Sequence, residues 1–230
     1  VACIGSLIWF MRSKMLAKRH NGAGMLPYPE EIKELLTAAT EKYPQIRFSV
    51  KLRLGWENAN ECLALLPLLN TLPLSHIILH PRLGKQQYKG EVDLNGFEAF
   101  YHGCDKPLLY NGDLHTIEDI QTVTERFPRL AGLVIGRGLL ANPALAWEYQ
   151  QNRKLSPDEM LSKIKQLHTA IYNSYEEQLQ GGETQLLMKM KNFWEYLLPN
   201  GNRKAQKAIH KTSKLTNYRI AVNDLLSSYQ

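Results

Sequence analysis

The chain of 230 residues, 44% of them hydrophobic, is long enough to form one large domain or two ordinary ones with a substantial core. It contains no run of about 20 apolar residues, the length that a membrane-spanning helix requires, and its longest apolar candidate, residues 2–11, lacks the preceding basic residues of a signal peptide. Its three cysteines have neither disulfide-like nor metal-ligand spacing, so we expect a cytoplasmic protein without a metal site.

The positive charge of the chain is concentrated in its last third. The net charge is +6; residues 1–150 contain 16 Lys and Arg against 15 Asp and Glu, whereas residues 151–230 contain 12 against 7. A basic surface of this kind suits a polyanion such as nucleic acid. The alternative is an ordinary solvated face of a helical domain.

From residue 28 to about 150 the sequence alternates between helical and strand patterns. Helix starts are marked by Pro29 and by Thr116 with Asp119 at capping-box spacing. The last three strands are apolar on both faces, which predicts a parallel α/β sheet covered by helices, either doubly wound or a (β/α)8 barrel. Helices are expected over residues 28–43, 58–72, 94–102, 116–127 and 142–150, and strands over 48–54, 76–80, 107–110 and 133–135.

After Lys154 the strand patterns stop. Ser156, Pro157 and Glu159 mark the start of a long helix, which Gly181 and Gly182 interrupt. The pattern predicts a helical bundle over residues 151–230, following an α/β domain over residues 1–150. Its further helices are expected over residues 183–198, 202–210 and 217–229.

Each expected strand ends in polar side chains of kinds that bind ligands. In a β/α barrel the carboxyl ends of the strands build the active site, so we expect these side chains to meet at one pocket. In chain order they are Lys51 and Arg53, then His80 and Arg82, then Asn111 and Asp113, then Gly136, Arg137 and Gly138.

The last two strand ends favour contacts to a phosphorylated cofactor. Glycine lets backbone N–H groups approach a phosphate closely, and Arg137 can add a bidentate contact. The alternative is a tight turn with a surface arginine. Asn111, Gly112 and Asp113 are a turn signal in isolation, but after a buried strand they favour hydrogen bonds to a cofactor.

Lys51 lies inside an apolar strand, where a cation is costly unless it meets an anion or an electron-rich ring. A cofactor carbonyl or ring edge would satisfy it, and so would a glutamate across the barrel. His80 is either a ligand of the same cofactor or an ordinary core histidine.

The loop of residues 82–90, with the sequence RLGKQQYKG, has the composition of an RNA contact. Its cations suit phosphates, Tyr88 can stack on a base, and glutamines can bind base edges or 2′-hydroxyl groups. The alternative is an ordinary solvated loop.

In their order and spacing, the segments VKLRLGW, HPRLGKQQYKG, YNGD and VIGRG resemble the tRNA-dihydrouridine synthases over about residues 22–150. The glycine-rich GAGML at residues 22–26 also fits, and MKMKNFW at residues 188–194 is more loosely similar to the family's basic C-terminal helix. The resemblance implies the C-terminal half of a (β/α)8 TIM barrel, followed by an all-α bundle that binds tRNA. It further implies an FMN-dependent enzyme that reduces uridine in tRNA to 5,6-dihydrouridine, with NADPH as the hydride donor.

The same resemblance implies roles for ten residues. Lys51 would contact the isoalloxazine ring of FMN and His80 would lie beside it. The ribityl and phosphate groups would be bound by Asn111, Gly112, Asp113, Gly136 and Arg137. Contacts to tRNA or the target base would come from Arg53, Arg82 and Lys89.

The chain departs from the family pattern near its start. The family's general acid is a cysteine in a Gly-Cys-Pro motif, expected near Phe10 or Met11, and this motif is absent from the chain, so no catalytic residue is identified. Residues 1–21 are atypical: residues 1–14 do not resemble the family's fourth strand, and the first three strands have no counterpart. We therefore expect a catalytically impaired chain, with open sheet edges that favour self-association.

Two other functions are compatible with the sequence. One is a non-catalytic tRNA-binding remnant of such an enzyme, and the other is a flavin barrel acting on a small molecule. The basic C-terminal region and the loop of residues 82–90 argue against the small-molecule enzyme. The sequence does not indicate which uridine position would be modified.

Overall fold

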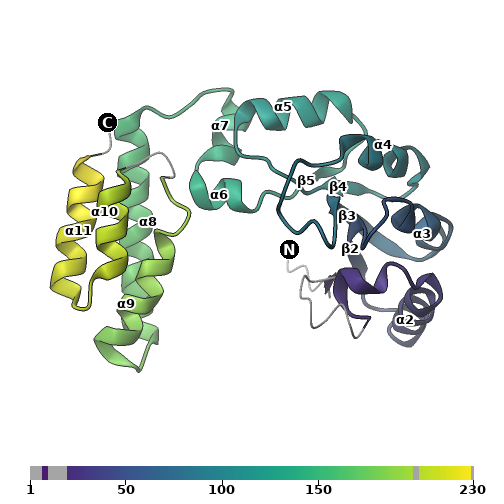
Figure 1. The fold of residues 1–230 in the computed structure, drawn as a ribbon, viewed down its shortest axis with the longest axis horizontal. Helices are drawn as coiled ribbons and strands as arrows, with labels where there is room; N and C mark the ends of the chain where they lie inside the picture. The colour runs from purple at the N-terminus through teal and green to yellow at the C-terminus, as the bar shows by residue number, and fades with distance from the viewer. Residues whose placement is uncertain (1–6, 10–19, 199–201, 229–230) are drawn as a thin grey trace. The chain divides into compact units, whose positions relative to one another are not determined.

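The computed structural model describes residues 7–9, 20–198 and 202–228 of the chain. The chain divides into two compact units, one comprising Val1–Asp113 and Gln121–Gly136 and the other Leu114–Ile120 and Arg137–Gln230 (Figure 1). This division lies earlier than the boundary expected after residue 150. The backbone N–H of Leu198 donates to the carbonyl of Ala141, which joins the segment after residue 136 to the helical unit.

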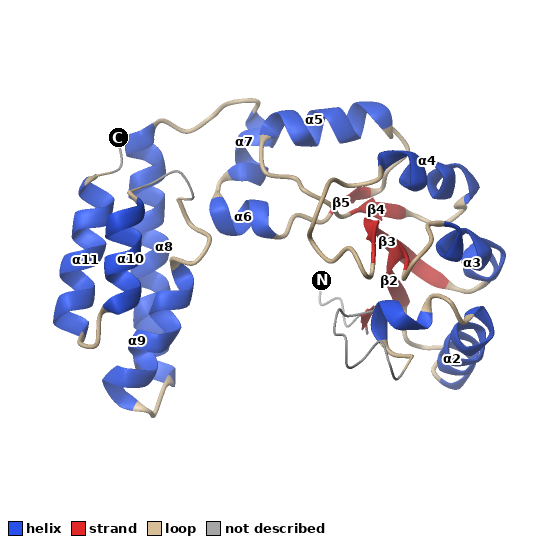
Figure 2. Cartoon of the chain, in the orientation of Figure 1, coloured by secondary structure: helices blue, strands red, loops and turns tan. Residues whose placement is uncertain are grey.

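The first unit is built on a five-stranded, all-parallel sheet with the order β1-β2-β3-β4-β5. Its strands are β1 (Leu7–Trp9), β2 (Phe48–Gly55), β3 (Leu74–Leu83), β4 (Leu108–Tyr110) and β5 (Gly132–Leu133). The connections carry η1 (Gly22–Met25), α2 (Pro29–Lys42), α3 (Asn60–Thr71), α4 (Leu94–Gly103) and α5 (Ile117–Arg126). Figure 2 shows α2, α3 and α4 flanking the sheet on one side. The predicted α/β class with parallel strands is therefore confirmed.

The first strand corrects the sequence analysis, which found no strand before residue 48. Leu7–Trp9 pairs in parallel with β2, with Trp9 in register with Lys51. A three-residue strand gives too short a pattern for periodicity to reveal. Phe10 and Met11, where the cysteine motif was expected, lie outside the described residues.

Aromatic packing behind β3 and β4 forms the centre of the first unit's core. Phe97 of α4 is fully buried and makes edge contacts with Tyr110 and Phe127, at centroid distances of 5.0 and 4.9 Å. Burial of one such ring contributes about 1.5–3 kcal/mol, and each aromatic pair adds about 0.5–1.5 kcal/mol. This packing fixes the position of β4 and hence of the residues that follow it.

The second unit is helical in the residues described. Its elements are α6 (Arg137–Ala141), α7 (Leu145–Gln151), α8 (Pro157–Gln178), α9 (Gly182–Phe193), α10 (Arg203–Lys211) and α11 (Leu215–Ser227), together with the first turn of α5. The predicted capping box at Ser156 is present, since its hydroxyl accepts from the N–H of Glu159 and the Glu159 carboxylate accepts from the N–H of Ser156. The equivalent pair of Thr116 and Asp119 also forms.

Two helix predictions need correction. The helix expected over residues 142–150 is observed as α7, which begins only at Leu145, whereas α6 over Arg137–Ala141 was not expected. Pro143 separates the two helices because it has no N–H to donate to a continuing helix. The helix expected over residues 183–198 ends earlier, at Phe193.

A polar cluster lies inside the apolar core of the bundle. Tyr218 of α11 is fully buried, and its hydroxyl lies 2.8 Å from Nε2 of His168 and accepts a 2.8 Å hydrogen bond from Nε1 of Trp194. The three residues therefore connect α8, the residue that follows α9, and α11. Among the described residues, no helix combines the length and apolarity needed to cross a membrane.

Candidate functional site

The carboxyl-end residues of β2 and β3 lie side by side. In the register of the two strands, Lys51 pairs with Ile78 and Arg53 pairs with His80. The backbone N–H of Asn111, just beyond β4, donates to the carbonyl of Leu79 in the next strand. Parallel pairing thus brings Lys51, Arg53, His80 and the end of β4 together at the carboxyl end of the sheet.

Lys51 is a half-buried cation without a carboxylate partner among the described residues. Burial, and then the neighbouring charge of Arg53, lower the pKa of the Lys51 ammonium to about 8. The predicted alternative, a glutamate paired across the barrel, does not occur within the part of the chain that is described. An anionic or electron-rich group at this position would stabilise the charged form of Lys51.

His80 is buried and surrounded mainly by positive charge. Burial is the first cause, and the charges of Arg53, Lys51 and Arg82 follow, so that the pKa of the His80 imidazole is lowered to about 3. Asp113 acts in the opposite direction but does not offset the three cations. His80 is accordingly a neutral imidazole at physiological pH.

Arg82 and Asp113 form an ion pair across the end of the sheet. Nη1 of Arg82 donates to Oδ1 of Asp113 at 2.8 Å, and Nη2 donates to Oδ2 of the same carboxylate. Nη2 also donates to the carbonyl of Gly90 at 2.7 Å. The hydrogen bonds and charge of Asp113 raise the pKa of Arg82 above its ordinary value.

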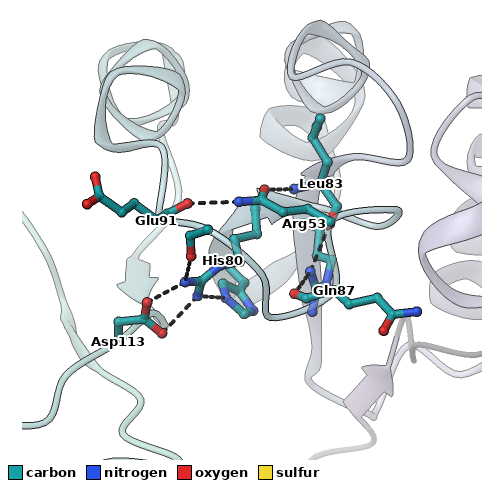
Figure 3. A network of polar contacts seen from close by, with 9 residues as sticks. Arg53, His80, Leu83, Gln87, Glu91 and Asp113 are labelled. Atoms are coloured by element: carbon teal, nitrogen blue, oxygen red, sulfur yellow. Dashed lines mark hydrogen bonds and ion pairs between the residues drawn. The ribbon is translucent and has the colours of Figure 1, made fainter.

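Arg53 holds the other part of the loop of residues 82–90. Its Nη1 donates to the carbonyls of Leu83 and Gln87, at 2.9 and 2.8 Å (Figure 3). Its guanidinium lies 5.7 Å from the ring centroid of Tyr88, which is 48% exposed. Lys89, the third predicted tRNA contact, is exposed.

The arginines Arg53 and Arg82, predicted as RNA contacts, are thus both buried and hydrogen-bonded to the chain itself. Gln86 likewise uses its side-chain amide within the loop, accepting from the N–H of Leu83 and donating to the carbonyl of Glu91. These contacts shape the loop, in which the side chains of Tyr88 and Lys89 are exposed.

The segment after β4 is closely packed. The side-chain amide of Asn111 donates to the carbonyl of Val134 at 2.7 Å, which joins the ends of β4 and β5. A Cβ atom on Gly112 would lie 2.9 Å from the Tyr110 hydroxyl and 3.1 Å from a Val92 methyl. A larger residue at position 112 would therefore have to displace the Tyr110 and Val92 side chains.

Gly136 and Arg137 lie after β5, at the junction of the two units. Gly136 is exposed, and apart from its chain neighbours no atom of the described residues lies within 4 Å of the position that its Cβ would occupy. Arg137 is half-buried and begins α6. Phosphate binding by this pair stays a prediction.

The two cysteines of the described residues are both buried. Cys62 of α3 is fully buried, and burial raises the pKa of its thiol to about 12. Cys104 is also buried with a raised pKa. The described residues contain no cluster of three or more His, Cys, Asp or Glu able to hold a metal ion.

The helices α10 and α11 carry a basic face. From the sequence we predicted only that the bundle as a whole is basic, not which helices carry the charge. The signal was present, because the sequence contains no Asp or Glu between Glu195 and Asp224. The Lys and Arg of this stretch are all exposed: Arg203, Lys204, Lys207, Lys211, Lys214 and Arg219. Residues 203, 207 and 211 are spaced four apart and so share one helix face.

Comparison with known proteins gives a consistent result. A family model described as "Dihydrouridine synthase (Dus)" matches residues 13–229. The chain is 27% identical over 175 residues to tRNA-dihydrouridine synthase B of Vibrio cholerae, covering 73% of this chain and 54% of that protein. It is 29% identical over 155 residues to tRNA-dihydrouridine(16) synthase of Haemophilus ducreyi, covering 66% of this chain and 47% of that protein. The chain thus spans about half the length of the curated relatives that it matches.

Proposed function

The chain belongs to the dihydrouridine synthase (Dus) family, and from this we propose that it provides the flavin-binding and RNA-binding parts of an enzyme that reduces uridine in tRNA to 5,6-dihydrouridine. The proposed cofactor is FMN, and NADPH is the proposed hydride donor. In this proposal the parallel sheet belongs to a (β/α)8 barrel, and the helical unit binds tRNA.

The observation that carries the flavin proposal is the uncompensated cation at the strand ends. Lys51 is half-buried beside a second cation, Arg53, and has no anionic partner among the described residues. The carbonyl-bearing edge of an isoalloxazine ring would accept its hydrogen bond and lower the cost of burying its charge. Neutral His80, on the adjacent strand, provides a second hydrogen-bonding group without a further charge.

The residues at the strand ends therefore fit a flavin. Lys51 and His80 would hold the ring, and Asn111 with Gly112 would line the ribityl chain. Asp113 would contribute indirectly, by holding Arg82 in place, because both of its carboxylate oxygens accept hydrogen bonds from Arg82. Gly136 and Arg137 would bind the phosphate. When bound, FMN supplies the hydride chemistry, and the protein supplies binding, orientation and charge.

The tRNA proposal rests on charge and exposure. The cations of α10 and α11 are exposed, and the nearest carboxylates in sequence are Glu195 and Asp224. Lysine and arginine rows of this kind neutralise phosphates without reading sequence. In the first unit, Tyr88 and Lys89 offer an exposed ring and cation beside the proposed flavin site, where they would contact the target nucleotide.

Purification of the chain tests the cofactor and RNA proposals separately. We expect a yellow protein with flavin absorbance, from which denaturation releases FMN, and a complex with unmodified tRNA in a mobility-shift assay. A colourless protein that binds tRNA and does not take up added FMN would favour the alternative function, a tRNA-binding remnant. Dihydrouridine formation on the same tRNA measures activity, which we expect to be low because the Gly-Cys-Pro motif is absent from these 230 residues.

A further inference from the structure

Arg82 is among the most completely enclosed polar side chains of the described chain, with 2% of its surface exposed. It lies near the end of β3 and contacts three separate features: the Asp113 carboxylate, the Gly90 carbonyl and the His80 ring. Its Nε has no hydrogen-bond partner, so the guanidinium is held through Nη1 and Nη2 alone. Bidentate pairing with Asp113 fixes the plane of this guanidinium.

The contact with His80 has a fixed direction. Nη1 of Arg82 lies 3.4 Å from Nε2 of His80, and a guanidinium can only donate (Figure 3). Nε2 must therefore be the accepting nitrogen. In a neutral imidazole, the nitrogen that does not accept carries the proton.

We infer that Arg82, locked in place by Asp113, is a positioning residue that holds His80 as the neutral tautomer protonated on Nδ1. His80 is then a fixed hydrogen-bond donor at Nδ1. The groups that face it within the described part of the chain support neutrality, since Lys51, Arg53 and Arg82 oppose a further positive charge and Asp113 alone among them favours one.

The same guanidinium connects His80 to the loop of residues 82–90. Arg82 binds the Gly90 carbonyl at the end of the loop, while Arg53 binds the carbonyls of Leu83 and Gln87 earlier in it. Resting on the proposed function, this arrangement gives the flavin site a donor of defined direction and a loop of defined position. The tautomer itself does not depend on that function.

The tautomer can be measured on the full chain without flavin or RNA. Long-range ¹H–¹⁵N NMR spectra of ¹⁵N-labelled protein at neutral pH distinguish the two ring nitrogens, and His80→Gln assigns the His80 signals. We expect a protonated Nδ1 and an unprotonated Nε2. A proton on Nε2, on both nitrogens, or exchanging between tautomers in the wild-type chain would overturn the inference.

Variants test the role of Arg82. Arg82→Met should give a mixture of tautomers at His80, and so should the more conservative Asp113→Asn, which removes the bidentate charge pair. The matched control is Arg126→Met, which breaks another arginine–carboxylate pair of the first unit, with Glu98, and should leave the His80 signals unchanged. An unchanged Nδ1 tautomer in a folded Arg82→Met or Asp113→Asn protein would contradict the assigned role, and if neither folds, the wild-type spectrum decides.

The flavin proposal and this inference can be refuted independently of each other. An Nδ1 tautomer in a chain that does not bind FMN would refute only the proposed cofactor. Conversely, FMN binding by a chain whose His80 carries its proton on Nε2 would refute only the positioning role. If both hold, Arg82→Met should also weaken FMN binding at least about tenfold.

Discussion

At the scale of single residues, the strand-end site is defined by an excess of positive charge. Lys51, Arg53 and Arg82 lie around His80, and Asp113 is the carboxylate that acts against them. Arg53 and Arg82 are satisfied by carbonyls and by Asp113, so they build the site. Lys51 remains the group whose charge an incoming ligand would stabilise.

The lowered pKa of Lys51 predicts a pH-dependent affinity for FMN. Lys51 is charged below its pKa of about 8 and neutral above it, so FMN binding should weaken as the pH rises through this value. Fluorescence titrations of FMN between about pH 7 and 9 measure this effect. The control is Lys51→Arg, which stays charged throughout and should give a flat profile; an equally steep decline in that variant would assign the effect to another group.

At the scale of secondary-structure elements, contacts between residues close in sequence could be predicted, and contacts between residues far apart in sequence could not. The capping boxes at Ser156 and Thr116 involve residues three positions apart, so the sequence reveals them directly. The pair of Arg82 and Asp113 joins residues 31 positions apart, and no periodicity reports such a contact. For this reason the sequence predicted which polar residues follow the strands. It did not predict which of them are buried and hydrogen-bonded within the chain and which are exposed.

The Tyr218 cluster should contribute measurably to the stability of the bundle. Tyr218→Phe leaves Nε1 of Trp194 without its acceptor and Nε2 of His168 without its partner. The free energy of unfolding should fall by about 1–3 kcal/mol, the cost of unsatisfied buried polar groups. Urea denaturation measures this change. Tyr172→Phe removes a hydroxyl whose hydrogen bond with Arg219 of α11 is exposed, so it should cost no more than about 0.5 kcal/mol. Equal losses in the two variants would contradict a special contribution of the Tyr218 cluster.

A buried carboxylate joins the short helices of the second unit to α8. Glu148 is 4% exposed, accepts from the N–H of Leu155 at 2.7 Å, and accepts from the side-chain amide of Asn142 at 2.7 Å. Glu148→Ala should lower the free energy of unfolding by about 2–4 kcal/mol, because both donors lose a charged acceptor. Glu148→Gln keeps one carbonyl acceptor and should lose less in the same denaturation experiment. A larger loss in the Gln variant would argue against this assignment.

At the scale of the whole molecule, the two units divide the proposed work. Apart from Arg137, the residues proposed to bind FMN belong to the first unit, and the second unit carries the exposed cations of α10 and α11 proposed to bind tRNA. The division into an α/β part and a helical part was predictable from the end of the strand patterns. The boundary was predicted too late, because α6 and α7 continue the alternating pattern along the chain while they contact the bundle.

The basic face of α10 should give tRNA binding a strong dependence on salt. Combining Lys204→Glu, Lys207→Glu and Lys211→Glu should weaken binding at least tenfold and reduce the slope of log affinity against log salt by about 2–3, since each phosphate contact contributes about 0.7–0.9. Filter binding at several salt concentrations provides the slope. Lys33→Glu with Lys42→Glu, on α2 of the first unit, is the control. An equal loss of tRNA affinity in this control variant would show that binding depends on the net charge of the chain and not on the face of α10.

The most direct test of the flavin site is the affinity of the folded chain for FMN with and without the Lys51 charge. Equilibrium titration should show one FMN per chain, and Lys51→Met should weaken binding at least about tenfold, equivalent to about 1.4 kcal/mol. Lys85→Met, which removes an exposed ammonium paired with Glu57 in the same unit, should leave the affinity unchanged. Absence of saturable FMN binding, or equal affinities of the wild type and Lys51→Met, would contradict a flavin site at these strand ends.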